Sequence, residues 1–160
     1  MKKLAIILLI GVFIAACSGG SSDTNTTNPE TPALETKKAD NANPSYDPER
    51  GTGKFTKVEF GEKLDAAMAA NGEKVYSVKC SSCHKLTTEK LVGPGWTGVT
   101  DRHAGVWIMN FVTNTDEMLN KDPKAQAQLE ICLVRMPNQN LTDDDARNLY
   151  EFMRRNDGVK

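Results

Sequence analysis

Cys80-Ser81-Ser82-Cys83-His84 places two cysteines three positions apart and a histidine directly after the second one. This Cys-x-x-Cys-His spacing is the attachment signal for a c-type haem. Two thiols one helical turn apart can each add to a vinyl group of the haem, and the histidine then binds the iron as its proximal ligand. The motif therefore predicts one covalently bound haem, with its iron, held by Cys80, Cys83 and His84.

Two other interpretations of the cysteine pair have less support. A thioredoxin-like redox motif needs a βαβ setting, and the flanking sequence shows no such alternation. A zinc site would need further ligands at suitable spacing. The chain contains two histidines, His84 and His103, and its other cysteines are distant in sequence, so no zinc-finger pattern is present. Haem attachment also explains the histidine that adjoins the second cysteine.

The residues on both sides of the motif predict helix and loop. A first helix is expected from about Glu62 to Lys79, where the motif begins. The glycine- and proline-rich residues 92–98 predict a loop. The apolar residues 106–112 predict another helix. We therefore expect an all-α fold.

Two further helices are predicted nearer the C-terminus. Asp122 and Pro123 are suited to the N-cap and first position of a helix that runs to about Arg135, before the next proline. The last helix is predicted to begin with a capping box, Thr142-x-x-Asp145. Four apolar residues then recur at helical spacing: Ala146, Leu149, Tyr150 and Met153.

The N-terminal 17 residues are typical of an export signal, with lysines at positions 2 and 3 before an apolar stretch, Leu4–Ile14. Its eleven residues are fewer than the roughly 20 that a permanent membrane span requires. The segment ends in Ile14-Ala15-Ala16-Cys17, which resembles a bacterial lipobox. We expect residues 1–17 to be a lipoprotein signal peptide that ends at Cys17, the lipidation site. The alternative is an ordinary signal peptide in which Cys17 is incidental.

Residues 18–58 are expected to form a flexible, disordered tether. Most of this segment is rich in Ser, Thr, Asn, Pro and charged residues, and such a composition cannot bury enough apolar surface to order itself. Between residues 18 and 53, Leu34 and Tyr46 alone could contribute much to a core. Residues 59–160 are then the folded domain.

Net charge and the number of cysteines limit the kinds of function that the chain can have. A formal net charge of −1 over 160 residues gives no basic field for nucleic acid. If Cys17 carries lipid and two cysteines carry haem, Cys132 is left without a partner. Its role stays open, although its helical spacing with Leu129 and Leu133 favours packing as a small apolar residue.

From about Lys63 to Arg155, the chain resembles class I cytochromes c. In that family a glycine marks the crossing of the N- and C-terminal helices, and an aromatic residue packs beside it. Two patterns carry this part of the resemblance: Gly72-x-x-x-Tyr76-x-x-x-Cys80 and Leu149-x-x-Phe152-Met153. The resemblance implies a small cytochrome c fold, in which helices and loops surround one haem, over residues 59–160.

The resemblance also implies roles at the haem. The carbonyl of Pro94 would accept a hydrogen bond from the haem-ligating His84, and Trp96 would lie against the haem face. Arg102 falls where the family often has an arginine that binds a haem propionate. Met136, in a loop before a proline, would be the second axial ligand of the iron, opposite His84. The haem-binding residues are thus expected to include Pro94, Trp96, Arg102 and Met136, with His84 and Met136 bound to the metal.

Two rivals to Met136 remain open at this point. Met118 lies in a polar stretch, and His103 would give an iron bound by two histidines. Ligation by His84 and Met136 would raise the reduction potential relative to two histidines. It would also fill both axial positions and leave none for a substrate.

The function implied is that of a monohaem electron carrier, not an enzyme, in the periplasm of a Gram-negative-type bacterium. It would be held to the membrane through Cys17 and act on no small-molecule substrate or nucleic acid. Its transient partners would be respiratory redox proteins, such as a quinol-oxidising complex and a terminal oxidase or a nitrous oxide or other nitrogen-oxide reductase. The alternative is a haem-based gas sensor or peroxidase-like haemoprotein with an open sixth coordination site.

Overall fold

The computed structural model describes residues 46–160, so Cys17, the predicted signal peptide 1–17 and residues 18–45 of the predicted tether lie outside the described residues. The described part is all-α, as expected, and contains no strand. Its helices are α1 (Ala66–Lys79), α2 (Val99–Arg102), α3 (Gly105–Thr113), α4 (Thr115–Lys121), α5 (Pro123–Cys132) and α6 (Asp143–Asn156). Among these residues no helix combines the length and apolar character needed to span a membrane.

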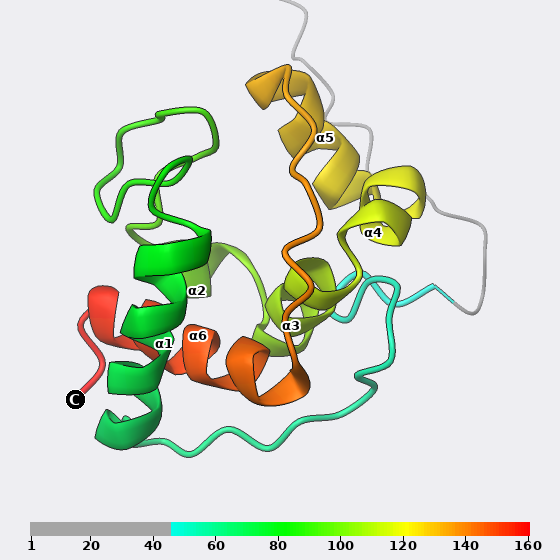
Figure 1. The fold of residues 1–160 in the computed structure, drawn as a ribbon. Coiled ribbons are helices and arrows are strands. Elements are labelled where there is room, and N and C mark those ends of the chain that lie inside the picture. The colour runs from blue at the N-terminus through cyan, green and yellow to red at the C-terminus, as the bar shows by residue number, and fades with distance from the viewer. Residues whose placement is uncertain (1–45) are drawn as a thin grey trace, which may run out of the picture. The chain divides into compact units, whose positions relative to one another are not determined.

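Helices α1 and α6 cross each other (Figure 1), and Gly72 of α1 lies at the contact with α6. A Cβ atom at this position would collide with the backbone carbonyl of Asn148 and would lie 2.8 Å from the Cβ of Phe152. Glycine is therefore needed for the two backbones to approach this closely, and the predicted crossing is confirmed. Tyr76 packs beside it, with its ring centroid 5.3 Å from that of Phe152.

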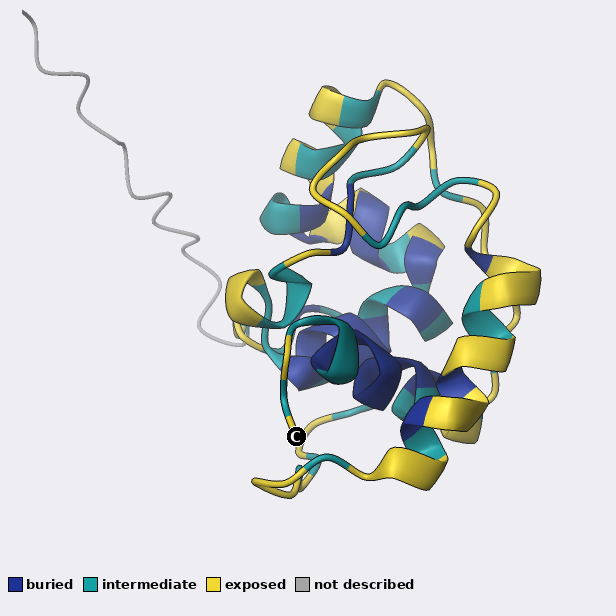
Figure 2. Ribbon diagram, turned by 90° about the vertical axis from the view of Figure 1, so that its left-hand side faces the viewer, coloured by how far each residue is buried: buried dark blue, intermediate teal, exposed yellow. Residues whose placement is uncertain are grey.

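The core is concentrated on α3 and α6 (Figure 2). The predicted capping box of α6 is present, since the Thr142 side chain accepts from the Asp145 N–H and the Asp145 carboxylate accepts from the Thr142 N–H. All four residues of the predicted apolar stripe on α6 are buried. Glu151 is buried as well, and it pairs with Arg147 and Arg154.

Two helices have different limits from those predicted. Helix α1 begins at Ala66, not near Glu62, because Asp65 is the N-cap and accepts from the Met68 N–H at 2.9 Å. The preceding residues are held outside the helix by Arg154, which donates to the Glu62 carbonyl at 3.0 Å. Helix α5 begins as predicted but ends at Cys132, because Leu133 adopts a left-handed conformation with φ 60°. The prediction that it continues to Arg135 was wrong.

The segment 46–58, expected to be part of the tether, packs against α3 and α4. The Asn110 side chain donates to the carbonyls of Arg50 and Phe55, each at 2.9 Å, and accepts from the Phe55 N–H. The Thr52 N–H lies 3.0 Å from the sulfur of the buried Met118. The ordered domain thus begins before residue 59, because these hydrogen bonds and the packing of Phe55 and Val58 against the core hold this segment.

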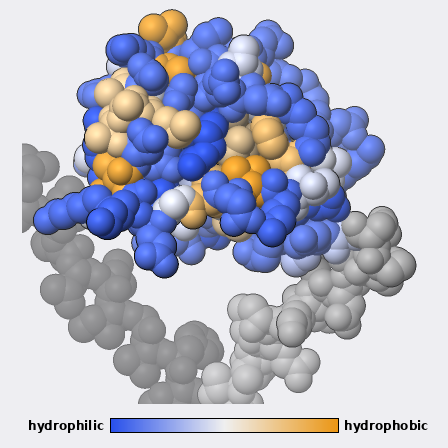
Figure 3. Space-filling model, turned by 90° about the horizontal axis from the view of Figure 1, so that it is seen from below, coloured by the Kyte–Doolittle hydropathy of each residue, from blue (hydrophilic) through white to orange (hydrophobic). Residues whose placement is uncertain are grey.

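On the face seen in Figure 3, hydrophobic side chains form limited areas among hydrophilic ones. Five of the exposed large apolar residues of the described chain come from two segments. Leu91 and Val92 follow the haem motif, and Ile131, Leu133 and Val134 lie at or just after the end of α5.

Candidate functional site

The Cys-x-x-Cys-His motif forms a turn that continues from the C-terminus of α1. The Cys80 N–H donates to the Tyr76 carbonyl, and the His84 N–H donates to the Cys80 carbonyl, each at 2.9 Å. The Tyr76 hydroxyl donates to the His84 carbonyl at 2.7 Å. Both motif cysteines are free thiols, Cys80 buried and Cys83 partly buried. Burial raises the pKa of the Cys80 thiol to about 11, so a neutral sulfur suits this position.

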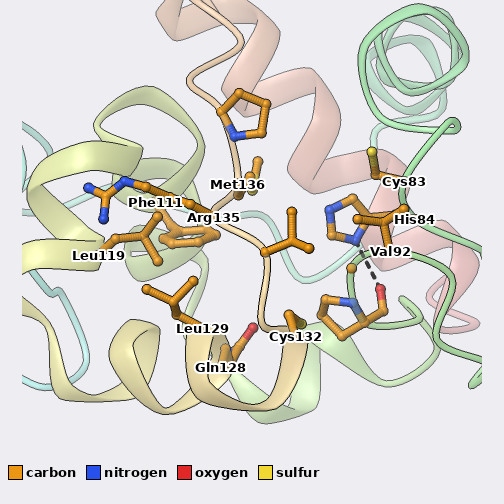
Figure 4. A pocket seen from close by; sticks show the side chains of 14 residues that line it. Cys83, His84, Val92, Phe111, Leu119, Gln128, Leu129, Cys132, Arg135 and Met136 are labelled. Atoms are coloured by element: carbon orange, nitrogen blue, oxygen red, sulfur yellow. Dashed lines mark hydrogen bonds between the residues drawn. The ribbon is translucent and has the colours of Figure 1, made fainter.

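The His84 ring is oriented by the loop that follows the motif. Its Nδ1 lies 2.9 Å from the Pro94 carbonyl oxygen (Figure 4), so the predicted hydrogen bond is present. A proton on Nδ1 leaves the Nε2 lone pair free to bind a metal. Burial lowers the pKa of His84, although the bond to Pro94 partly opposes this, and the neutral form is the one that ligates iron. Gly93 packs directly on the ring, where any Cβ atom would collide with His84 Cε1.

Two cavities adjoin the His84 ring, and the larger has a volume of about 460 Å³. This volume lies within the usual range for cofactor sites. The lining of both is mainly apolar and includes no aspartate or glutamate. Five residues line both cavities: His84, Pro94, Phe111, Gln128 and Met136. The cavities are lined by apolar side chains, and the His84 ring beside them has a nitrogen that is free to bind a metal. Such a site suits a large, flat, apolar group that carries a metal.

Met136 lines both of the cavities that His84 lines (Figure 4), whereas Met153 lines only the larger one. Met136 lies in the loop between α5 and α6, as predicted. Its rival Met118 is fully buried on α4, against Thr52, and lines neither cavity. This arrangement favours Met136 over Met118 as the second ligand.

His103 lines the larger cavity but is engaged elsewhere. Its ring stacks on Trp107 at 4.2 Å between centroids, and its Nε2 lies 2.7 Å from Nε2 of Gln128. Burial, aided by the positive charges of Lys124 and Arg102, lowers the pKa of His103 to about 4. His103 Nδ1 is the one buried side-chain polar atom between residues 46 and 160 that lacks a hydrogen-bond partner. Because Gln128 occupies Nε2, His103 is less suited than Met136 to bind iron.

Trp96 and Arg102 both line the larger cavity. Trp96 is buried, with its ring centroid 5.5 Å from that of His84. Arg102 donates to the carbonyls of Thr97 at 2.6 Å and Gly95 at 3.1 Å, which holds its guanidinium at the edge of the cavity. The arrangement is compatible with the expected roles of both residues beside a haem.

Trp107 also lines the larger cavity, but its indole N–H donates to Asp122 Oδ2 at 3.1 Å and is not free for a propionate.

Sequence reasoning did not identify the side of the larger cavity that α5 forms. The residues concerned recur at helical spacing, three or four positions apart along one face: Lys124, Ala127, Gln128 and Ile131. Cys132 lines the smaller cavity and is partly buried, as a small apolar residue would be.

A family model described as cytochrome c matches residues 69–157. The chain belongs to the cytochrome c family. Cytochrome c from Rhodothermus marinus has 31% sequence identity and a TM-score of 0.63, with 66% of this chain and 90% of that chain covered. An engineered form of it, Rma TDE, has 31% identity and a TM-score of 0.66, with 69% and 98% covered. The same engineered cytochrome bound to a carbene intermediate has a TM-score of 0.63. No curated protein matches the sequence.

A member of this family carries a covalently bound haem c with iron and is an electron-transfer protein. The residues present fit that group. Cys80 and Cys83 are free for two thioether bonds, and His84 Nε2 has no hydrogen-bond partner within residues 46–160. The bound haem supplies reversible one-electron chemistry at its iron. The chain contributes by holding the His84 ring through Pro94 and by enclosing the cofactor in apolar side chains.

Proposed function

We propose that this cytochrome passes single electrons between redox proteins of a respiratory chain in the periplasm. The observation that carries the proposal is that His84 and Met136 line the same two cavities. With a bond from each of them, the iron would have both axial positions filled. A six-coordinate iron that changes only its oxidation state is suited to electron transfer and leaves no position for a substrate, so we propose no enzymatic activity.

Partner proteins would meet the cytochrome briefly. Donors and acceptors of the proposed kind are a quinol-oxidising complex and a terminal oxidase, or a nitrous oxide or other nitrogen-oxide reductase. Encounters between such redox proteins typically bury little surface. The described residues from 60 to 160 carry similar numbers of acidic and basic side chains, so attraction between net charges is not expected to dominate these encounters.

Spectra of the purified holoprotein test the electron-carrier proposal. We expect a ferric charge-transfer band of the kind that accompanies methionine–iron bonding, and its loss in Met136→Ala. We also expect the reduced wild-type protein to bind carbon monoxide slowly and weakly at neutral pH. Rapid, tight binding of carbon monoxide by the wild type would instead support the gas-sensor or peroxidase-like alternative.

The membrane anchor is proposed to be a lipid on Cys17, reached through the signal peptide 1–17. The support comes from the sequence Ile14-Ala15-Ala16-Cys17 alone. Expression of Cys17→Ala beside the wild type in a Gram-negative host tests it. The wild type should fractionate with membranes and the variant should not acquire lipid. Equal lipid labelling of the two proteins would contradict the anchor without affecting the electron-transfer proposal.

A further inference from the structure

The loop that carries Met136 has little main-chain support. Within the described chain, residues 134–141 take part in no backbone–backbone hydrogen bond. Most of these residues are exposed, whereas Met136 is partly buried. On the C-terminal side of Met136, Lys79 donates to the Gln139 carbonyl at 3.3 Å. Side-chain contacts must therefore set where the Met136 thioether lies.

Arg135 provides such a contact on the N-terminal side of Met136. Its Nη2 donates to the Asp116 carbonyl at 3.2 Å, to Asp116 Oδ1 at 3.3 Å and to Asn120 Oδ1 at 3.0 Å. All three acceptors belong to α4, and we call this set of contacts the Arg135 clasp. Helix α4 is itself firmly packed, since Met118 and Leu119 on its inner side are buried. The clasp thus connects the neighbour of Met136 to the core.

We propose that Arg135 is a positioning residue for Met136, and that the clasp opposes replacement of the methionine by an external ligand. This inference rests on the proposed ligation of the iron by Met136. In the exchange, the bond between Met136 sulfur and iron breaks and a bond from a neutral external donor forms. No electron or proton is transferred. Without the clasp, fewer contacts hold the loop in the position from which Met136 reaches the iron. Replacement of Met136 by an external ligand therefore becomes more favourable.

An exposed ion pair that merely adds to stability would behave differently. The Arg135 side chain is 44% exposed and that of Asp116 is 64% exposed, so the pair alone contributes little to folding. A purely structural role would change the free energy of unfolding and leave the affinity for external ligands unchanged. A positioning role would change that affinity in the folded protein.

Titration of the ferric holoprotein with imidazole separates the two roles. Arg135→Ala should bind imidazole roughly three- to tenfold more tightly than the wild type, the range expected for one exposed pair and its hydrogen bonds. Asn120→Ala, which removes one acceptor, should show a smaller increase. Arg135→Lys keeps the charge and should fall between the wild type and the alanine variant. On heating, the ferric methionine–iron band of Arg135→Ala should begin to weaken at a lower temperature than the band of the wild type.

Lys121→Ala is the matched control, because it removes an exposed cation that belongs to α4 itself and pairs with Glu117, not with the loop. Its imidazole affinity should equal that of the wild type. The variant Met136→Ala distinguishes a failure of the proposed iron ligation from a failure of the inference about Arg135. If it keeps the wild-type band and affinity, the proposed ligation and the role of Arg135 both fail. If it binds imidazole tightly while Arg135→Ala matches the wild type, the inference about Arg135 is overturned and the proposed function stands.

Discussion

At the scale of single residues, the contact between Gly93 and the His84 ring restricts the position of the ring. Gly93 does not have a positive φ, so its backbone conformation is open to alanine. A Cβ atom there would nonetheless collide with Cε1 of His84 and would lie 2.7 Å from Nδ1. The glycine is thus needed for space beside the ligand and not for a special turn.

We therefore expect Gly93→Ala to displace the His84 ring and to lower the yield of protein with a normal haem spectrum. The comparison is the reduced spectrum per amount of protein, for variant and wild type. Gly61→Ala is the control, since a Cβ atom at Gly61 would meet only the Lys63 carbonyl at an ordinary 3.5 Å. A normal haem yield and spectrum in Gly93→Ala would show that the ring has more freedom than the structure indicates.

His103 should make stability depend on pH. Its pKa is lowered from 6.5 to about 4 in the folded protein, first by burial and then by Lys124 and Arg102. As the pH falls from 6.5 to 4, the unfolded chain binds a proton that the folded chain does not, so the free energy of unfolding falls. This contribution is complete above pH 6.5 and is lost toward pH 4. Denaturation of His103→Gln across this range should show a smaller decrease than the wild type, and an equal decrease would contradict the assignment.

At the scale of helices, the crossing of α1 and α6 positions the haem motif. Gly72→Ala would gain helix propensity but place a methyl group against the Asn148 carbonyl. We expect the clash to dominate and to lower the free energy of unfolding by about 1–3 kcal/mol. Chemical denaturation measures this, with the exposed Asn71→Ala on the same helix as control. A Gly72→Ala protein as stable as the control would contradict the close crossing.

Asp122 connects three segments through one buried carboxylate. It caps α5 by accepting from the Ala125 N–H, and it also accepts from Trp107 Nε1 and from the Tyr46 hydroxyl at 2.6 Å. Burial and this last bond raise the pKa of Tyr46. Asp122 therefore joins α5 to α3 and to the segment that precedes the predicted domain.

Removal of this carboxylate should cost more than removal of an ordinary helix cap. We expect Asp122→Ala to lower the free energy of unfolding by about 2–4 kcal/mol, because α5 loses its cap while the buried Trp107 donor and the partly buried Tyr46 donor lose their acceptor. Asp65→Ala, which removes the exposed cap of α1, should cost about 1 kcal/mol. Equal losses in denaturation experiments would mean that the contacts to Trp107 and Tyr46 contribute little.

The elements that sequence predicted well are those with a local signal. The capping box of α6 and the Asp122 cap of α5 each depend on a few neighbouring residues, whereas the close crossing at Gly72 was implied by the resemblance to class I cytochromes c. Helix α4 was not predicted, because its seven residues carry only a short inward face in an otherwise polar stretch. The packing of residues 46–58 was missed as well, because Asn110 holds backbone groups that leave no apolar pattern in the sequence.

The residues of the candidate site divide in the same way, into those that the sequence indicated and those that depend on distant contacts. The resemblance to class I cytochromes c implied the hydrogen bond from His84 to the Pro94 carbonyl, and the structure contains it. The arrangement of His103 was not predictable, since it depends on Gln128 from α5 and on stacking against Trp107. The cavity wall contributed by α5 likewise depends on how that helix packs, because helical spacing shows which residues share a face but not what that face contacts.

At the scale of the whole molecule, the account depends on one haem joined to one pair of cysteines. The single Cys-x-x-Cys-His motif of the chain allows one such group. The apolar cavities beside His84 and the family membership agree with it. The ligand assignments, the proposed function and the role of Arg135 all follow from this attachment.

The intact mass of the protein, purified from a host that attaches haem c, tests this attachment most directly. The mass should exceed that of the polypeptide and any lipid by one haem, and the increment should persist under denaturing conditions. A variant with both Cys80→Ala and Cys83→Ala should lack it, while Cys132→Ala should keep it. A wild-type protein that shows no haem increment, or one that keeps it without Cys80 and Cys83, would contradict the account.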